Sequence, residues 1–351
     1  MSIALVFGVL TLVLGIYLWW GFRVLPGERW QILATVPVRK NGREGDWTGV
    51  NFTWYGLLSA NAYLVAVLVL LVLLGSVGVR PTVVALLATV MLLCCVPASR
   101  LVARLVEKKA HTFTVGGAAF VGILITPPVI MLLNNILGVR LSFHIPLMAA
   151  CAAIAIAYAF GEGLGRLACI SFGCCYGKPV TAISGTLGGW LKRYGVIFHG
   201  NTKKIAYADN MEGIKVIPVQ ALTALLYTAC GLCALALFFY SRHSTAFLMA
   251  SIVTQGWRAF SETMRADHRG GGNISAYQIM GIVGMLYAIV LSLVIAPEFT
   301  GHVGVASALA GLWRPDLILF LQLLWLVIFI HAGRSTVTGA TVRLHLHADR
   351  V

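Results

Sequence analysis

An Arg–Glu–Arg triplet stands at the end of an apolar stretch, in the segment WRAFSETMRAD at residues 257–267. Arg258, Glu262 and Arg265 are spaced i, i+4 and i+7, so a continuous helix would place them on one face. The triplet has one surplus positive charge, and guanidinium groups bind phosphate through paired hydrogen bonds. The pattern indicates a phosphate site, and a salt-bridged trio with a purely structural role is the alternative.

A second charged pair lies in GEGLGRLACISFGCCYGKPV, residues 161–180. Glu162 and Arg166 are four residues apart, in the order that stabilises a helix. The five glycines of this segment allow close backbone approach and exposure of N–H groups to an anion, although simple helix packing would also explain them. We expect this segment and the triplet to converge on one phosphate.

The same segment contains three cysteines, Cys169, Cys174 and Cys175. No C-x-x-C spacing and no nearby histidine complete a tetrahedral zinc set there, so no metal is expected. A thiol near Arg166 would be reactive through a lowered pKa. Packing as small apolar side chains is the other interpretation.

The elements that carry these residues are predicted to be transmembrane helices. Of the 351 residues, 59% are hydrophobic and 11% are charged, far below the roughly 25% charged residues of a soluble domain. The sequence therefore predicts an all-α, polytopic transmembrane bundle. About nine spans are expected, at 3–20, 56–78, 81–98, 115–137, 145–163, 218–240, 245–264, 274–296 and 314–331.

The net charge of +14 is interpreted in this membrane setting. It favours an anionic membrane surface or an anionic lipid substrate as partner rather than nucleic acid. The interval 165–217 is expected to form a small polar lobe, and residues 22–54 a second polar stretch. The first twenty residues lack a basic start and a cleavage site, so they are interpreted as a retained anchor.

Six segments, in order along the chain, resemble motifs of the prolipoprotein diacylglyceryl transferase family. They are WYGL at 54–57, TVGGAAFVG at 114–122, FGEGLGRLACISFGCCYG at 160–177, VIPVQAL at 216–222, WRAFSETMRAD at 257–267 and SAYQIMGI at 275–282. The resemblance implies a membrane core over residues 51–296, with an extra N-terminal span and loop (1–50) and an extra C-terminal span and basic tail (297–351).

The resemblance implies a transferase that takes a diacylglyceryl group from phosphatidylglycerol and leaves glycerol phosphate, with no cofactor. It assigns catalytic roles to Arg166, Arg258 and Glu262. Substrate-binding roles fall on Tyr55, Gly116, Gly117, Glu162, Gly165, Gly173, Gly177, Gln220 and Arg265. A transporter or flippase for an anionic lipid, or a non-catalytic lipid binder, would use the same arginines without breaking a bond.

Several family positions are occupied by different residues here. Val115 stands at the family's proposed histidine base, and the nearest histidine is His111. Cys169 and Cys174 replace an asparagine and a glutamate of the signature, and Ile217 replaces a further histidine. The general base and the acceptor are therefore left open.

The orientation of the protein in the membrane is also left open. With nine spans, every loop that carries a motif falls on one side, together with all of the 26 Lys and Arg residues except Arg80, Arg140, Arg242 and Arg314. The positive-inside rule places that side in the cytoplasm. The family resemblance implies a periplasmic catalytic face on the inner membrane.

Overall fold

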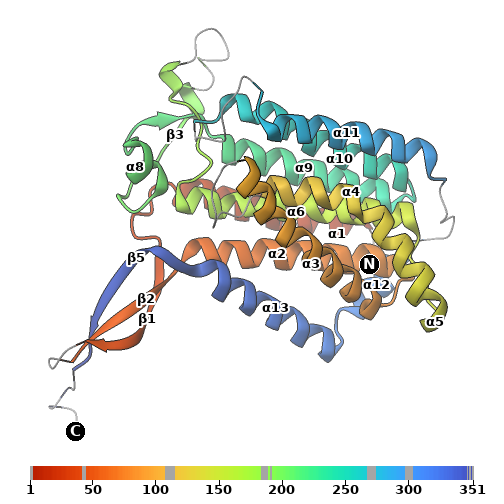
Figure 1. Cartoon of the computed structure of the whole chain (residues 1–351), viewed down its shortest axis with the longest axis horizontal. Helices are drawn as coiled ribbons and strands as arrows, with labels where there is room; N and C mark the ends of the chain where they lie inside the picture. Colours follow the sequence, from red (N-terminus) through yellow and green to blue (C-terminus); the bar gives the residue numbers. More distant parts are fainter. Residues whose placement is uncertain are drawn as a thin grey trace.

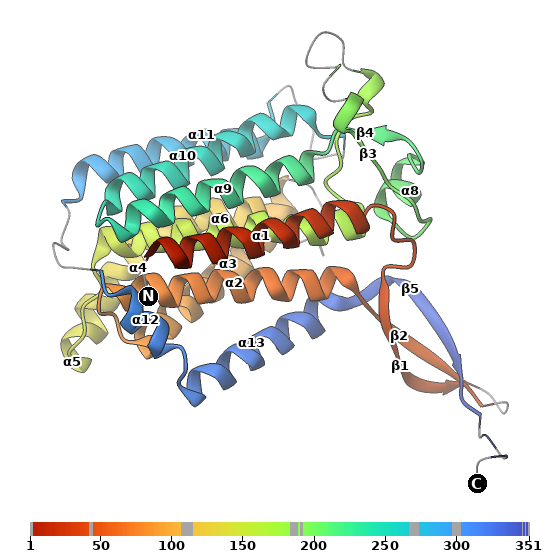
Figure 2. The same cartoon turned by 180° about the vertical axis from the view of Figure 1, so that it is seen from behind.

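The chain folds as a bundle of long helices with a small sheet and a polar lobe at one end (Figures 1 and 2). The computed structural model describes residues 3–41, 45–106, 115–182, 189, 192–266, 274–296, 303–345, 347 and 349.

In this described part, eight helices are long and apolar enough to cross a membrane. They are α1 (Ile3–Val24), α2 (Trp54–Ser76), α3 (Pro81–Val106), α4 (Val115–Leu133), α6 (Leu147–Phe172), α9 (Val219–Phe239), α11 (Ala276–Val294) and α13 (Pro315–Gly333). α4 continues through a π-helical turn (Asn134–Gly138) into α5 (Val139–Leu141), and α12 (Val305–Gly311) is short. The protein is a multi-pass membrane protein, and the predicted fold class is confirmed.

Helix α6 is the most deeply buried of these helices: 83% of its apolar window is buried, against 56% for α9, the next highest. The sequence prediction ended this span at residue 163, but α6 continues to Phe172. The extension is possible because Gly161 lies against Ala66 of α2 and Gly163 lies against Thr228 of α9, where added Cβ atoms would come within about 3.1 Å. Small residues let these helices approach closely, so the glycines here belong to the helix and not to the lobe.

Helix α10 (His243–Ser261) corresponds to the predicted span 245–264 but is more polar than the eight apolar helices. It packs against α6, α9 and α11. Several polar side chains on it are buried, among them Thr254, Gln255 and Arg258. A helix surrounded by other helices can keep a polar face away from lipid, and α10 presents such a face to α6 and α9.

The predicted polar stretch at 22–54 and the basic tail together form a sheet that the sequence did not indicate. Strands β1 (Ile32–Asn41), β2 (Asp46–Thr53) and β5 (Arg334–Arg343) pair antiparallel in the order β1-β2-β5. Asn51, fully buried in the central strand, accepts a hydrogen bond from Thr35 Oγ1 (2.7 Å) and donates one to Thr338 Oγ1 (3.1 Å). One side chain thus links all three strands.

The last helix and strand pack directly on the predicted core. α13 lies along α2, and Gly56 meets the backbone of Gly333 where no side chain would fit. Thr53 Oγ1 donates a hydrogen bond to the Gly333 carbonyl oxygen at 3.1 Å. The C-terminal region is therefore joined to the start of α2 by contacts at both the helix and the sheet.

The polar lobe follows α6 and lies at the same end of the bundle as the sheet (Figure 1). It contains a 3-10 turn (Val180–Ala182), β3 (Val196–Ile197), α8 (Lys204–Asp209) and β4 (Lys215–Val216). Lys203, just before α8, is fully buried, and its Nζ donates hydrogen bonds to the carbonyl oxygens of Ser171 (2.8 Å) and Leu25 (2.9 Å). This amine therefore ties the lobe to the ends of α6 and α1.

The buried amine predicts a pH dependence of stability. Burial lowers the pKa of Lys203 to about 8, and the negative charge of Glu28 opposes the shift. Between pH 8 and 10.5 the unfolded chain holds a proton that the folded chain has released, so stability rises with pH in this window by up to on the order of 3 kcal/mol. We expect the thermal unfolding midpoint of Lys203→Met to lack this rise. Lys192→Met, at an exposed lysine, should keep it, and parallel profiles for wild type and Lys203→Met would contradict the assignment.

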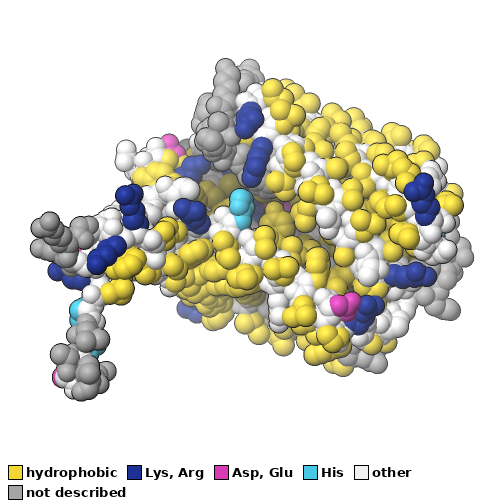
Figure 3. Space-filling view, turned by 60° about the horizontal axis from the view of Figure 1, so that its bottom comes forward, with side chains coloured by type: hydrophobic (Ala, Val, Ile, Leu, Met, Phe, Trp, Pro, Cys, Tyr) yellow, Lys and Arg dark blue, Asp and Glu magenta, His cyan; other side chains and the backbone are white. Residues whose placement is uncertain are grey.

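The surface agrees with membrane insertion. Figure 3 shows hydrophobic side chains over most of the helical bundle, while Lys and Arg side chains lie toward its ends and on the sheet and lobe. Apolar residues of α1, α11 and α13, such as Leu12, Leu293 and Leu319, are exposed. Lipid is the environment that such a belt requires.

Candidate active site

Arg166 forms an ion pair inside the bundle. It lies on α6, and its Nη2 contacts the carboxylate of Glu162 one turn earlier. Only 12% and 7% of the two side chains are exposed. Charges at this depth are expensive unless paired, so the predicted Glu162–Arg166 pair is a buried feature of α6.

Arg258 reaches the same region from the last turn of α10 and is 6% exposed. Its Nη1 donates a hydrogen bond to the hydroxyl of Tyr158 on α6 at 3.4 Å. The guanidinium carbon lies 5.9 Å from the ring centroid of Tyr277 on α11. Gly116 of α4 faces the guanidinium so closely that a side chain there would overlap it. Three helices besides α10 therefore enclose Arg258.

Two tyrosines connect the arginines. The rings of Tyr158 on α6 and Tyr227 on α9 lie 6.1 Å apart, and both hydroxyls are within the electrostatic range of Arg166, Arg258 and Glu162. Tyr227 also donates a 2.6 Å hydrogen bond to the Thr254 carbonyl of α10. The two predicted arginines thus share one buried cluster, which we call the arginine–tyrosine cluster (Tyr158, Glu162, Arg166, Tyr227, Arg258 and Tyr277).

The sequence prediction did not include the three tyrosines. Tyr158, Glu162 and Arg166 are spaced four residues apart on one helix face, and this repeat was the available signal. Tyr277 lies inside the segment SAYQIMGI. Tyr227 carries no local signal, because a tyrosine in an apolar helix is common.

Each arginine of the cluster retains an unused donor. The Nε atoms of Arg166 and Arg258 are buried and have no hydrogen-bond partner among the described residues. Buried donors are almost always satisfied in native structures. Two unsatisfied guanidinium donors in one cluster are therefore a feature that an anionic group would explain.

The predicted single helix face for Arg258, Glu262 and Arg265 is wrong. α10 ends at Ser261, residues Glu262–Met264 form a 3-10 turn, and Arg265 is extended. Glu262 and Arg265 form an ion pair of their own at 3.7 Å, and both side chains are about 95% buried. The physical reason for the break is that the chain after Ser261 pairs with another segment.

That segment follows α6. Backbone hydrogen bonds run from Lys178 N to the Met264 carbonyl (2.9 Å) and from Ala266 N to the Tyr176 carbonyl (3.1 Å), with a β-bridge between Gly177 and Arg265. The two segments that the sequence analysis singled out are therefore joined side by side next to the cluster.

The three glycines of this region have distinct structural settings. Gly173 adopts a left-handed conformation (φ 66°) and ends α6. At Gly177 a Cβ atom would lie 2.5 Å from the Ile217 carbonyl oxygen, so only glycine fits. Gly165 lies against Ala62 of α2 at an ordinary contact distance of 3.8 Å. Gly173 and Gly177 are thus needed to turn the chain and bring the paired segments together.

The three cysteines gather beside the cluster. The Sγ atoms of Cys169, Cys174 and Cys175 lie within 4.8 Å of one another. Hydrogen bonds with the other two thiols, together with burial, raise the pKa of Cys174 well above its ordinary value. This direction is opposite to the lowered pKa that a reactive thiol at Cys174 would have.

Two further predicted residues hold this cysteine loop. Gln220 Nε2 donates a 2.8 Å hydrogen bond to the Cys174 carbonyl oxygen. Tyr55 packs its ring 5.6 Å from that of Phe172, and its hydroxyl is within the electrostatic range of all three thiols. Gly117 of α4 is placed elsewhere, against Val102 of α3. His111 lies outside the described residues.

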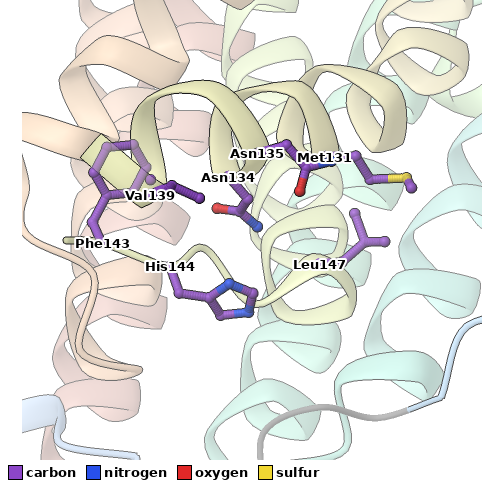
Figure 4. A pocket seen from close by; sticks show the side chains of 8 residues that line it. Met131, Asn134, Asn135, Val139, Phe143, His144 and Leu147 are labelled. Carbon is purple, nitrogen blue, oxygen red and sulfur yellow. The ribbon is translucent and has the colours of Figure 1, made fainter. Parts of the chain in front are cut away.

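A surface hollow of about 440 Å³ lies at the other end of the bundle (Figure 4). It is found where α4 ends and α6 begins, roughly 27 Å along α4 from Gly116. Among the described residues that line it there is no Asp, Glu, Lys or Arg, and its Asn134 already bonds the backbone of Ile145 through both side-chain atoms at 2.9 Å. The arginine–tyrosine cluster is therefore the better candidate for chemistry on an anion.

Comparison with known protein families identifies the family of this chain. The family model for prolipoprotein diacylglyceryl transferase matches residues 46–294. The chain belongs to the prolipoprotein diacylglyceryl transferase family. A search of curated proteins with this sequence finds no match.

The matched region of this diacylglyceryl transferase family member begins at β2 and ends with α11. It contains the whole arginine–tyrosine cluster and all three cysteines, while α1, β1, α12, α13 and β5 lie outside it. The protein is thus a membrane transferase by family, and its candidate site is built entirely from the family core.

The close approach of Gly116 to Arg258 gives a testable prediction. We expect Gly116→Ala to lower activity by at least tenfold, because the added methyl group would displace the guanidinium and also meet Tyr277 at 2.9 Å. Gly122→Ala on the same helix meets only Cys95 Sγ, at 3.4 Å, and should keep near-normal activity. Initial rates of both variants, normalised to folded protein, check this prediction. Equal rates would show that the position of Arg258 is not limiting.

Proposed function

We propose that this membrane transferase uses an anionic phospholipid, phosphatidylglycerol, as the donor of a diacylglyceryl or glycerophosphate group to an acceptor still to be identified. The observation that carries the proposal is the pair of arginines Arg166 and Arg258, whose buried, unsatisfied Nε donors share one cluster inside an apolar bundle. A phosphodiester at this position would supply both acceptors and negative charge.

The charges of the cluster suit this donor. Glu162 offsets Arg166, so Arg258 supplies the surplus positive charge. In diacylglyceryl transfer, the bond between glycerol C3 and the phosphate oxygen breaks, and that carbon bonds to the acceptor nucleophile. The electron pair leaves with glycerol phosphate, and the acceptor's proton goes to a base. Because the leaving phosphate gains negative charge, the guanidinium groups bind it more strongly as the bond breaks, which lowers the barrier.

The remaining residues are given supporting roles. Glu262 orients Arg265 through their 3.7 Å ion pair, with proton acceptance as its alternative role. Arg265 lies next to Gly177 and closes the site from the lobe side. Tyr55 hydrogen-bonds the lipid headgroup, and Tyr158 holds Arg258 in place.

The location proposed for this site is the inner membrane. The lobe, the sheet and the ends of α6 and α10 lie at one end of the bundle, so the candidate site lies near one of the two membrane faces. The family favours a periplasmic face for it and the distribution of basic residues a cytoplasmic one. A single cysteine introduced into the lobe of the protein is treated with a membrane-impermeant thiol reagent in intact cells. Labelling indicates a periplasmic face, and protection from the reagent indicates a cytoplasmic one.

A donor assay tests the proposed function. Purified protein is mixed with vesicles of phosphatidylglycerol labelled in the glycerol headgroup or, separately, in an acyl chain, and a cell extract supplies the acceptor. We expect headgroup label to appear as glycerol phosphate and acyl label to appear on the acceptor. Phosphatidylethanolamine vesicles are the control for headgroup specificity.

Two other outcomes would contradict the proposal. Label that only changes leaflet, with no glycerol phosphate released, would indicate a transporter. Label that binds and is recovered unchanged would indicate a lipid-binding protein without turnover. Transfer of the phosphorus-containing part instead of the acyl part would select the glycerophosphate branch.

A further inference from the structure

The three thiols beside the cluster form a compact group. Cys169 lies in the last turn of α6, and Cys174 and Cys175 follow the left-handed turn at Gly173. Their Sγ atoms all lie within 4.8 Å of one another, and all three residues are half-buried. Three sulfur atoms bound to one ion require separations of this order.

The backbone holds this group in place independently of the thiols. Cys174 N donates a 3.0 Å hydrogen bond to the Cys169 carbonyl, and the Cys174 carbonyl accepts one from Gln220 at 2.8 Å. Cys175 has a φ of 58°, a conformation uncommon for any residue with a side chain. Such left-handed residues cluster at functional sites, where the surrounding structure enforces them. The thiols are thus preorganised on a fixed turn.

One positive charge lies close to the three thiols, and a cation that binds them displaces their protons. Arg166 lies within electrostatic range of Cys169 and Cys175 and is positively charged. The hydroxyl of Tyr55 on α2 lies within electrostatic range of all three thiols. Among the described residues, the group contains no carboxylate or imidazole within the same 4.8 Å. Ligands of this kind select soft cations and reject Mg²⁺ and Ca²⁺.

We propose that Cys169, Cys174 and Cys175 form a three-thiolate site for one soft d¹⁰ cation, Cu⁺ or Zn²⁺. Each thiol that binds gives its proton to solvent, so no oxidant or reductant is required. Cu⁺ is three-coordinate in the site, whereas Zn²⁺ takes a water as its fourth ligand. The inference is independent of the donor lipid and of turnover.

The test uses the full chain, purified in detergent, stripped of metal and reduced with a phosphine. His345→Ala and His347→Ala are introduced in every sample, because these two histidines lie near each other at the C-terminus and would take up metal themselves. Cu⁺ is titrated against a chromophoric chelator without oxygen, and Zn²⁺ is titrated against a second chelator. We expect one equivalent to bind, with thiolate-to-copper absorption in the near ultraviolet for Cu⁺.

Matched variants locate the site. Cys169→Ser, Cys174→Ser and Cys175→Ser should each weaken binding by on the order of 100-fold, because two thiolates leave the coordination incomplete. Cys233→Ser, at an exposed cysteine on α9, should bind as tightly as the parent. The bound ion should raise the unfolding midpoint of the parent but not that of the triple Cys→Ser variant, and circular dichroism confirms that the metal-free variants are folded.

Any of three results would overturn the site. The first is that the parent protein binds neither ion, and the second is that the triple variant binds as tightly as the parent. The third is that protein purified without reductant contains a disulfide within the group by mass spectrometry and takes up no metal after that disulfide is reduced. The cation of the site is the ion, Cu⁺ or Zn²⁺, that the protein takes more strongly from its chelator. Because binding is measured without turnover, failure of the metal site and failure of the lipid donor are distinguishable.

Discussion

Arg258→Ala is expected to lower turnover of phosphatidylglycerol by roughly 10³-fold, which corresponds to about 4 kcal/mol of transition-state stabilisation. The effect is large because Arg258 supplies the surplus positive charge of the cluster, in a buried position enclosed by α4, α6 and α11. The fold should be retained, because no carboxylate is left unpaired when this side chain is removed: the hydrogen bond to Tyr158 is the polar contact that is lost.

Two variants make the Arg258 result specific. Arg258→Lys keeps the charge but loses the planar set of donors, so it should recover only part of the activity. Arg242→Ala removes an exposed arginine at the other end of the same helix and should leave the rate unchanged. Initial rates and unfolding midpoints of the three proteins are the measurements. Near-normal turnover by folded Arg258→Ala would remove Arg258 from the mechanism.

The second large effect concerns the Glu162–Arg166 pair and separates stability from catalysis. Arg166→Ala should abolish turnover and also destabilise the fold by about 3 kcal/mol, because Glu162 is left as an uncompensated buried charge. The double variant Arg166→Leu/Glu162→Leu removes both charges and should regain most of the stability. It should remain inactive, because the guanidinium that binds phosphate is still missing.

The double variant decides the interpretation of Arg166. If it were both stable and active, the pair would serve only to hold α6 in place. If Arg166→Ala were as stable as wild type, Glu162 would not depend on Arg166 for compensation. Thermal unfolding in detergent and the glycerol phosphate assay measure the two properties on the same samples.

The sequence was sufficient for the bundle and for its two main arginines. Apolar runs fix helices at membrane depth, and a charge inside such a run, as at Arg166 and Arg258, is too costly to be incidental. The prediction that Arg258, Glu262 and Arg265 lie on one helix face failed, because α10 ends at Ser261, three residues after Arg258. Nothing in the sequence from Ser261 to Met264 stops a helix, and α10 ends there because residues 264–266 pair with 176–178. A helix pattern read from residues 257–267 contains no information about the segment 176–178, which is distant in the sequence.

The sheet and the tyrosines were missed for related reasons. β2 and β5 are almost 300 residues apart, and neither run is distinctive without the other. Tyr227 joins the cluster only because α9 and α6 pack closely, and the three thiols meet only because Gly173 reverses the chain. Each of these features depends on tertiary contacts that periodicity and spacing do not encode.

The pairing of β2 with β5 has a topological consequence. Paired strands lie on the same side of a membrane, so the chain must cross an even number of times between them. Of the eight apolar helices, α1 precedes β2, which leaves seven between the two strands. Among the described helices, α10 is the one that makes the number even. The polar helix that carries Arg258 is therefore itself a crossing. A chain in which it failed to insert would leave its final strand on the wrong side of the bilayer, unable to reach its partner.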